Sequence, residues 1–127
     1  MPSPTDRHYS ESHEWFLQEE NTITVGITRH AVDELTDITY VEMQPVGTEI
    51  EQGGSLGEVE SVKTTAEVLS ALGGTITEVN EALADDPSIL NSDPYDQGWL
   101  LKLTVSDSSN LATLMDGAAY DQQTGNA

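Results

Sequence analysis

The sequence predicts a mainly β fold, a barrel or sandwich of about seven short strands with small helices added. Hydrophobic residues make up 36% of the chain. They fall into alternating runs such as NTITVGI and ITYVEM, and a period of two is typical of half-buried strands. Glycine, proline and asparagine separate these runs at close spacing. At 127 residues the chain provides one domain with a single modest core.

The first third of the chain is expected to form two paired strands, a short helix and a third strand. Residues 13–20, HEWFLQEE, predict the first strand, and Asn21 suits the turn into TITVGI. Thr28 fits the N-cap of a helix over TRHAVDEL. Residues 37–43, DITYVEM, alternate again and predict a strand. One face of that strand would hold Ile38, Tyr40 and Glu42.

The middle of the chain is organised around two glycine pairs. Gly53-Gly54 begins ten residues before Lys63, and Gly73-Gly74 begins ten residues after it. The runs between them, SLGEVESV and TTAEVLSA, are rich in Val, Thr and Ser, which favour strands. Pairing these strands outward from their turn places Lys63 at the exposed tip of a hairpin. A helix is the alternative, because Glu60, Lys63 and Glu67 have i−3 and i+4 spacing, but the β-branched residues disfavour it.

The last third is expected to add two strands and a C-terminal helix. TITEV predicts one strand, NEAL a helical turn, residues 85–98 a loop with two prolines, and WLLKLTV a buried strand. Asp107 or Ser108 is a candidate cap for a helix over NLATLMDG. Residues 9–120 are expected to form the domain, with a flexible N-terminus over 1–8 and a flexible tail over 121–127.

The chain is strongly acidic: it has 23 acidic and four basic residues, for a net charge of −19. No basic patch is available to neutralise nucleic-acid phosphates or anionic lipid heads. Disorder is the alternative for so acidic a chain, and the alternating runs restrict it to the ends. Near-loss of lysine with abundant acid is similar in composition to haloarchaeal cytoplasmic proteins, where salt screens surface repulsion. The chain shows no apolar leader or 18-residue apolar run, so a cytoplasmic location is expected.

Metal and thiol chemistry find little support in the sequence. There is no cysteine, which excludes a disulfide framework and a thiol nucleophile. His8, His13 and His30 are scattered and have no spacing typical of zinc ligands, so no metal site is expected.

Lys63 is one of only two lysines, and three roles compete for it. A surface lysine is ordinarily a solubilising charge. A Schiff-base lysine needs a desolvated or cationic setting, whereas Glu58, Glu60 and Glu67 favour the protonated form here. A lysine at a turn can instead be presented for covalent modification by a cofactor. Lys102 alternates within WLLKLTV, as an ordinary strand residue does, and is not expected to be modified.

Six blocks in order carry a resemblance that covers residues 9 to 120. They are HEW at 13–15, VGIT at 25–28 with His30-Ala31, ESVK at 60–63, EVNEAL at 78–83, DPY at 93–95 and GWL at 98–100. Together they resemble the H proteins of the glycine cleavage system. The resemblance implies a barrel-sandwich hybrid of the lipoyl-carrier type, with lipoate in amide linkage on Lys63. It also implies that Glu60 and Gly74 serve recognition by the lipoylating enzyme.

The resemblance implies a role as well. Such a carrier makes and breaks no bonds itself. It takes an aminomethyl group from the pyridoxal-phosphate glycine decarboxylase to the tetrahydrofolate-dependent aminomethyltransferase, and then passes electrons to the FAD-containing dihydrolipoamide dehydrogenase. It is expected to be a monomer. Ser12, Glu14 and Glu67 match positions near the cleft that shelters the arm, although relatives often carry Asp at the position of Glu67 and Ala near Thr64-Thr65.

Three rival interpretations share the idea of a carrier. Lipoyl domains of 2-oxoacid dehydrogenase complexes are shorter, usually read Asp-Lys-Ala, and lack the HEW and GWL blocks. A biotin carrier would show Met-Lys-Met, whereas Val62 and Thr64 flank this lysine. An H-like protein that relays lipoate in lipoate metabolism would need the same lysine and stays open. An acidic β protein without a cofactor is the least favoured reading.

Overall fold

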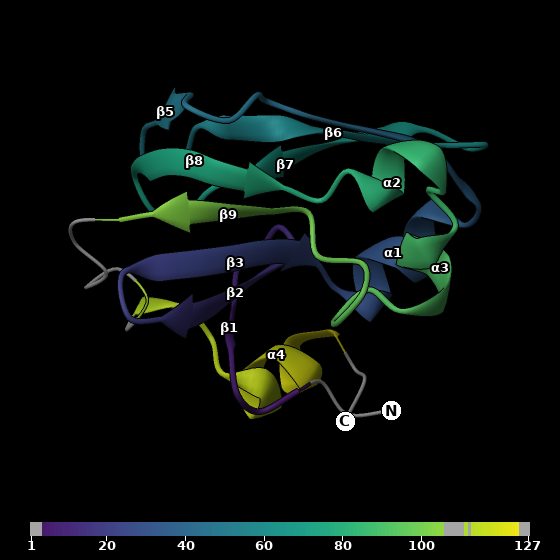
Figure 1. The fold of residues 1–127 in the computed structure, drawn as a ribbon. Coiled ribbons are helices and arrows are strands. Elements are labelled where there is room, and N and C mark those ends of the chain that lie inside the picture. Colours follow the sequence, from purple (N-terminus) through teal and green to yellow (C-terminus); the bar gives the residue numbers. More distant parts are fainter. Residues whose placement is uncertain (1–3, 106–110, 112, 125–127) are drawn as a thin grey trace.

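A computed structural model describes residues 4–105, 111 and 113–124. Its strands form two antiparallel sheets (Figure 1). A six-stranded sheet has the order β1-β2-β3-β9-β8-β5, and a three-stranded sheet has the order β4-β6-β7. The mainly β fold with small added helices is therefore confirmed. The strands are β1 (His8–Tyr9), β2 (Glu14–Glu19), β3 (Thr22–Ile27), β4 (Ile38–Met43), β5 (Glu49–Ile50), β6 (Ser55–Ser61), β7 (Thr65–Leu69), β8 (Gly74–Val79) and β9 (Leu101–Thr104).

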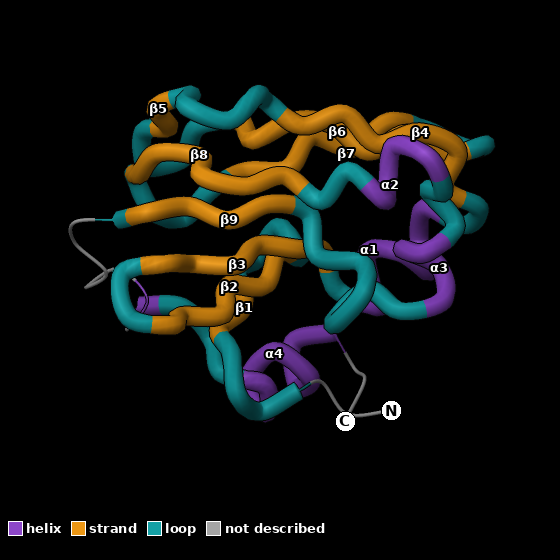
Figure 2. Tube along the Cα trace, in the orientation of Figure 1, coloured by secondary structure: helices purple, strands orange, loops and turns teal. Residues whose placement is uncertain are grey.

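The described residues also form four short helices (Figure 2). They are α1 (Arg29–Leu35), α2 (Ala82–Asp85), α3 (Ile89–Ser92) and α4 (Gly117–Thr124). The first three gather at one end of the sheets, and α4 lies beside β1 (Figure 1). The predicted N-cap is confirmed, because the Thr28 hydroxyl accepts a hydrogen bond from the Ala31 N–H at 3.2 Å. None of the helices in the described part of the chain is long and apolar enough to cross a membrane.

The main core lies between the two sheets. Both sheets contribute aliphatic side chains that are almost fully buried. Removing this apolar surface from water stabilises the packing of the two sheets against each other. Examples from the larger sheet are Ile23, Val25 and Leu103, and examples from the smaller sheet are Val41, Val59 and Val68.

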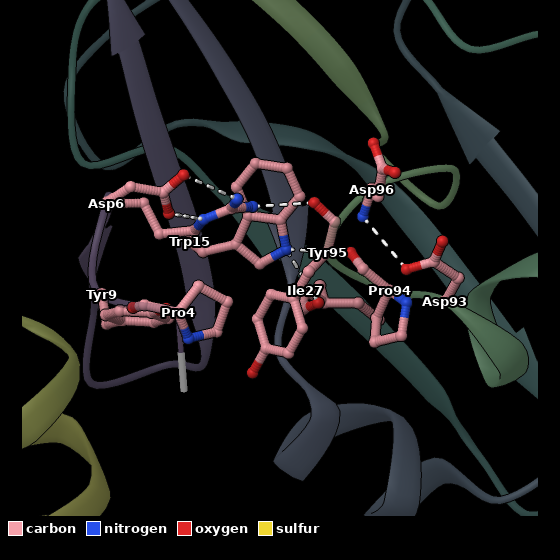
Figure 3. A network of polar contacts seen from close by, with 10 residues as sticks. Pro4, Asp6, Tyr9, Trp15, Ile27, Asp93, Pro94, Tyr95 and Asp96 are labelled. Carbon is pink, nitrogen blue, oxygen red and sulfur yellow. Dashed lines mark hydrogen bonds and ion pairs between the residues drawn. The ribbon is translucent and has the colours of Figure 1, made fainter. Parts of the chain in front are cut away.

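A second, aromatic cluster packs on the outer side of β2. It consists of Tyr9, Trp15 and Tyr120, each at most 1% exposed. The Trp15 indole N–H donates to the carbonyls of Ile27 at 3.1 Å and Pro94 at 3.0 Å (Figure 3). The Tyr9 and Tyr120 rings stack with centroids 4.9 Å apart. This cluster joins the two ends of the chain to the sheet.

Two predictions of local structure were wrong. The alternation in β4 is broken by a register shift between Ile38 and Tyr40, so Ile38 and Val41 are buried while Tyr40 is exposed. The predicted loop over 85–98 contains α3. The flexible N-terminus over 1–8 stays a prediction: residues 1–3 lie outside the described residues, the Arg7 side chain is largely buried against the Trp15 ring, and His8 begins β1.

The C-terminal helix exists but begins later than expected. Leu111 and Thr113 have 3₁₀-helical geometry, but Met115 pairs with Tyr9 through two backbone hydrogen bonds of 2.8 and 3.0 Å, so the predicted helix does not continue through Met115 to residue 117. The helix is α4 instead, and its residues Tyr120 and Asp121 are buried. The flexible tail over 121–127 stays a prediction, because 121–124 belong to α4 and 125–127 lie outside the described residues. Intrinsic helix propensity did not predict the position of this helix, because the burial of the Tyr120 side chain determines where the helix forms. The proposed caps Asp107 and Ser108 lie outside the described residues.

Candidate functional site

The turn that carries Lys63 is held by the Ser61 hydroxyl together with a backbone hydrogen bond from the Ser61 N–H to the Thr64 carbonyl at 2.8 Å. Strands β6 and β7 pair through a register that includes Glu60 with Thr65, which confirms the predicted hairpin and rules out the helix alternative. The Ser61 hydroxyl accepts hydrogen bonds from the N–H groups of Lys63 at 3.1 Å and Thr64 at 3.0 Å. It also lies 3.0 Å from the Thr64 carbonyl, to which it donates. A serine of this kind substitutes for missing backbone bonds in a turn.

The Lys63 side chain is exposed at the tip of this hairpin. Its Nζ lies 3.5 Å from the backbone carbonyl of Glu34 at the end of α1. The Val62 N–H donates to the Asp37 carbonyl at 3.1 Å, which anchors the turn to the segment after that helix. Val62 is itself 68% exposed. An enzyme that modifies Lys63 can therefore reach both the amine and an apolar residue beside it.

Lys63 is one of the residues that line a groove of about 470 Å³. We call it the lysine groove. Three segments far apart in the sequence line it: the turn before β2, helix α1 and the lysine hairpin. The lining residues are Ser12, His13, Ala31, Glu34, Leu35, Lys63, Thr64 and Ala66. A chain attached to the amine of Lys63 could lie along this groove.

The predicted sheltering residues occupy different places. Ser12 lines the groove, and its hydroxyl donates to Glu14 Oε1 at 2.5 Å. Glu14 lies behind it, only 2% exposed, where it also accepts from the Ser10 hydroxyl at 2.6 Å and the Leu69 N–H at 3.2 Å. Burial raises the pKa of the Glu14 carboxyl above its usual value, and these donors oppose the rise. Glu14 therefore fixes Ser12 rather than facing the groove.

Glu67 does not join the groove. It is exposed on β7, and successive residues of a strand point to opposite faces, so it lies on the other face from the lining residue Ala66. Glu67 pairs across the ladder with Glu58, which pairs with Glu42 on β4. The outer face of the three-stranded sheet thus carries a row of three exposed carboxylates. We call Glu42, Glu58 and Glu67 the acidic row.

The two predicted recognition residues are also far from each other in the fold. Glu60 lies near the end of β6, three residues before Lys63 and one before Ser61. Gly74 begins β8 in the other sheet and pairs with Ile50. A Cβ on Gly74 would stand 2.6 Å from the Thr104 carbonyl oxygen, so close packing of β9 alone requires glycine there. The role of Glu60 and Gly74 in recognition stays a prediction.

The sequence did not predict a series of hydrogen-bonded side chains that connects the C-terminal helix to the groove. The Tyr120 hydroxyl lies 2.6 Å from His13 Nδ1 and 2.7 Å from the Thr28 hydroxyl. Burial raises the pKa of Tyr120 to about 12. Burial and the neighbouring His30 ring lower the pKa of His13, so its imidazole is neutral near pH 7. Tyr120 is 107 positions from His13 and 92 positions from Thr28, so no local sequence pattern indicates these contacts.

Comparison with known proteins agrees with this geometry. A family model described as Glycine cleavage H-protein matches residues 7–126. Glycine cleavage system H protein 2, mitochondrial, from Arabidopsis thaliana is 45% identical over 117 residues, which cover 92% of this chain and 75% of the relative. The glycine cleavage system H protein of Thermus thermophilus is 43% identical over 122 residues, covering 96% of this chain and 95% of the relative.

A solved structure shows the same fold. The crystal structure of a glycine cleavage system H protein from Mycobacterium marinum matches with a TM-score of 0.89 at 36% identity, covering 97% of this chain and 99% of that one. Proteins of this kind are carriers rather than enzymes, and they hold lipoate covalently on a lysine. On its sequence and its fold, the chain belongs to the glycine cleavage H-protein family.

Proposed function

We propose that Lys63 is the residue through which this lipoyl carrier of glycine cleavage holds its lipoate. The observation that carries the proposal is the exposed amine at a hairpin tip, on a residue that also lines a groove. Lipoate would supply a disulfide that is reduced and opened as one sulfur takes up the aminomethyl group, and the dithiol left after that group is passed on would return two electrons and reform the disulfide; a chain without cysteine cannot supply this chemistry itself. Ser61 fixes the turn and thereby the direction in which the amine leaves the surface.

Lys102 offers a matched control for this assignment. It lies within β9, its Nζ is 3.7 Å from a Glu78 carboxylate oxygen, and the same nitrogen is 5.3 Å from the Trp99 ring centroid. An amine that lies on a strand and already contacts a carboxylate and an aromatic ring is a poor substrate for an enzyme that must bind a turn.

Intact mass and peptide mapping of protein made with a lipoylating enzyme and lipoate test the proposal. We expect one lipoyl group on wild-type protein and on Lys102→Arg, and none on Lys63→Arg. Lipoate on Lys63→Arg, or a modified peptide containing Lys102, would refute the assignment. Circular dichroism of Lys63→Arg serves as the folding control, since an exposed substitution leaves stability within about 0.5 kcal/mol.

The partners that we propose are the enzymes that load, unload and reoxidise the arm. They are the pyridoxal-phosphate glycine decarboxylase, the tetrahydrofolate-dependent aminomethyltransferase, the FAD-containing dihydrolipoamide dehydrogenase and the lipoylating enzyme. Glu60 is the proposed recognition residue for the last of these, because it flanks Ser61 on the hairpin. We expect Glu60→Gln to slow lipoylation of Lys63 and Glu58→Gln, two residues away on the same face, to leave the rate unchanged. Equal rates for both variants would remove Glu60 from recognition.

Sheltering of the arm is proposed to depend on Ser12, with Glu14 as its positioning residue. Glu14 already accepts three hydrogen bonds, so it acts through the Ser12 hydroxyl rather than by contact with the cargo. We expect Ser12→Ala and Glu14→Ala each to speed the release of formaldehyde and ammonia from the loaded carrier, and the double variant to do no more than one of them. Additive effects, or no effect of Ser12→Ala, would contradict this role. The exposed residue Glu11 provides the control Glu11→Ala.

We also propose that the protein works in concentrated salt, in keeping with the composition of haloarchaeal proteins. The net charge of −19 includes the acidic row, where like charges stand opposite one another across two ladders. Molar salt reduces the screening length to about 3 Å and removes most of this repulsion. Thermal unfolding in 0.05 M and 2 M potassium chloride should show a clearly higher midpoint in the concentrated salt. An unchanged midpoint would mean that surface repulsion does not limit stability.

A further inference from the structure

Two of the three histidines come together at the mouth of the lysine groove, although the sequence spacing predicted no metal site. The rings of His13 and His30 have centroids 4.6 Å apart, and Glu34 stands beside them. One ligand atom from each of the three residues lies within 4.8 Å of the other two. His13 and Glu34 both line the groove, so the cluster faces solvent on one side.

The ligand set suits a zinc-class ion. Two imidazole nitrogens and one carboxylate oxygen are the donors of many open zinc sites, in which a fourth position is left to water. His30 and Glu34 are four residues apart on α1, the spacing that places two metal ligands on one helix face. His30 Nε2 and Glu34 Oε1 are 3.1 Å apart. Two ligands of a tetrahedral zinc ion with bonds of about 2.0–2.1 Å stand roughly 3.3 Å apart.

The His13 ring is fixed through one of its two nitrogens. The Tyr120 hydroxyl lies 2.6 Å from Nδ1, and the Thr28 hydroxyl in turn fixes Tyr120, so Nε2 is the ring nitrogen left for an ion. A hydrogen bond on the second ring nitrogen of this kind supports most metal-binding histidines. His13 also has a φ of 71°, a left-handed conformation that is uncommon outside glycine. The N–H of Thr28 donates to the His13 carbonyl at 3.0 Å, which helps to hold that conformation.

The cluster needs little rearrangement to close around an ion. The three ligand atoms lie within 4.8 Å of one another, which is about 1.5 Å beyond the ligand spacing of a tetrahedral site, and the Glu34 side chain, 65% exposed, is free to change rotamer as the cluster closes. The net charge of −19 raises the local concentration of cations over the whole surface. The competing arrangement is an ordinary ion pair between His30 and Glu34, which involves no metal.

We propose that His13, His30 and Glu34 form a binding site for a divalent transition-metal ion of the zinc class, with the fourth coordination position open to the lysine groove. The site is formed by the chain itself, so it does not depend on attachment of lipoate to Lys63. It adds a ligand-binding property to a protein whose family role is that of a carrier.

Zinc chloride titrated into the full chain, without lipoate and after dialysis against a chelator, tests the proposal by calorimetry in molar potassium chloride. We expect one strong site with a stoichiometry of one. His30→Gln and Glu34→Gln should each weaken it at least about tenfold. The controls are His8→Gln, which removes the histidine outside the cluster, and Asp33→Asn, which removes a carboxylate from the same helix. Both should stay within about twofold of wild type.

Two further measurements separate a metal site from a merely structural cluster. Tyr120→Phe keeps the ring but loses the hydroxyl at His13, and we expect zinc affinity to fall about tenfold. Zinc should raise the unfolding midpoint of wild type and Asp33→Asn but not of Glu34→Gln, because only a bound ion stabilises the folded state. Glu34 is exposed, so this variant folds whatever the fate of the histidine variants.

Several results would overturn the site. Weak binding of many zinc ions, equal in all variants, would show diffuse attraction to surface carboxylates. A single site that survives both His30→Gln and Glu34→Gln would place the metal elsewhere. Four-coordinate Co²⁺ gives intense visible absorption, so a Co²⁺ spectrum that is the same in wild type and His13→Asn would exclude His13. Asparagine is chosen there because it tolerates a positive φ.

Discussion

The corner around Trp15 and the turn that carries Lys63 are stabilised in opposite ways. Trp15 is 1% exposed, and its indole N–H is shared between two carbonyls from distant segments. The Arg7 guanidinium lies 4.6 Å from its ring centroid, and Gly26 allows the ring to rest against β3. The Lys63 turn instead depends mainly on local hydrogen bonds to one serine hydroxyl and exposes its side chains.

This difference separates positions that specify the fold from positions that present a group. A change in the Trp15 corner disturbs several segments at once and should cost much stability. A change in the turn should cost little stability and still alter how the lysine is offered to a partner. Stability and modification are therefore two independent readouts for the comparison.

Trp15→Ala should give the largest effect on stability. It removes a fully buried indole and leaves the Ile27 and Pro94 carbonyls without their donor, so we expect a loss of about 3–5 kcal/mol. Urea unfolding in molar potassium chloride measures it. Trp99→Ala is the control and should cost clearly less, because Trp99 is only partly buried. Similar losses for both would mean that the Trp15 corner is not special.

Gly26→Ala should come second. A Cβ at Gly26 would lie 2.4 Å from Cε2 of the Trp15 ring, so the indole must move at a cost of about 1–3 kcal/mol. Gly73→Ala is the control, since its Cβ would meet nothing closer than 3.4 Å. In a Trp15→Phe background the Gly26→Ala cost should shrink, because the atoms that clash are absent from phenylalanine. Additive costs would contradict a direct clash.

Ser61→Ala should have a smaller effect on stability and a larger one on modification. It removes an acceptor for two N–H groups in an exposed turn, where hydrogen bonds contribute about 0.5–1.5 kcal/mol. The rate of lipoylation at Lys63 should fall by more than this modest loss of stability suggests. Ser61→Thr keeps a hydroxyl and should restore most of the rate. Failure of the threonine to do so would show that the hydroxyl is not what fixes the turn.

Glu58→Gln tests whether repulsion between the carboxylates of the acidic row, on the outer face of the hairpin, lowers the stability of the protein. The change removes the middle charge of the acidic row, and we expect a gain of about 0.2–1 kcal/mol at low salt. The gain should shrink in 2 M potassium chloride because the salt screens the remaining pairs. Equal gains at both salt concentrations would point to a cause other than repulsion. Glu81→Gln, exposed and outside the strands, serves as the control.

Asp6→Asn should give the smallest effect, at the edge of the Trp15 corner. The hydrogen bond from Arg7 holds the pKa of the Asp6 carboxyl below its usual 3.8. The folded pKa is therefore lower than the unfolded one, so the stabilisation is present above pH 3.8 and is lost as the pH falls through the folded pKa. We expect the variant to lose about 0.2–1 kcal/mol at pH 7 and almost nothing near pH 2. A pH-independent difference in unfolding free energy would contradict this.

Much of the hairpin was predictable because its signals are local. Glycine pairs, β-branched runs and a turn placed Lys63 correctly at an exposed tip. The burial in β4 was not predictable, because the register shift after Ile38 depends on pairing with β6. The same limit explains Glu67: its place next to Lys63 in the sequence hides the fact that strand alternation turns it away from the groove.

Contacts between distant segments account for the remaining gaps. His13 and His30 have no metal-ligand spacing in the sequence, yet β2 and α1 bring their rings together. Tyr120 was expected to be the last residue of the domain, yet it lies in the middle of a helix, α4, with its ring buried. Sequence patterns of short period could not reveal either contact, because both form only when segments that are distant in the sequence pack together in the folded chain.

Helix α4 has a practical consequence for anyone who shortens the chain or fuses it to another protein. Its Tyr120 hydroxyl lies within hydrogen-bond distance of His13 and Thr28, so the carboxyl-terminal helix holds His13, a residue that lines the lysine groove. A truncation placed before Gly117 by inspection of the β-sheets would keep every strand and still remove that tyrosine. Such a fragment would be a different molecule at the groove, although its sheet topology would look intact.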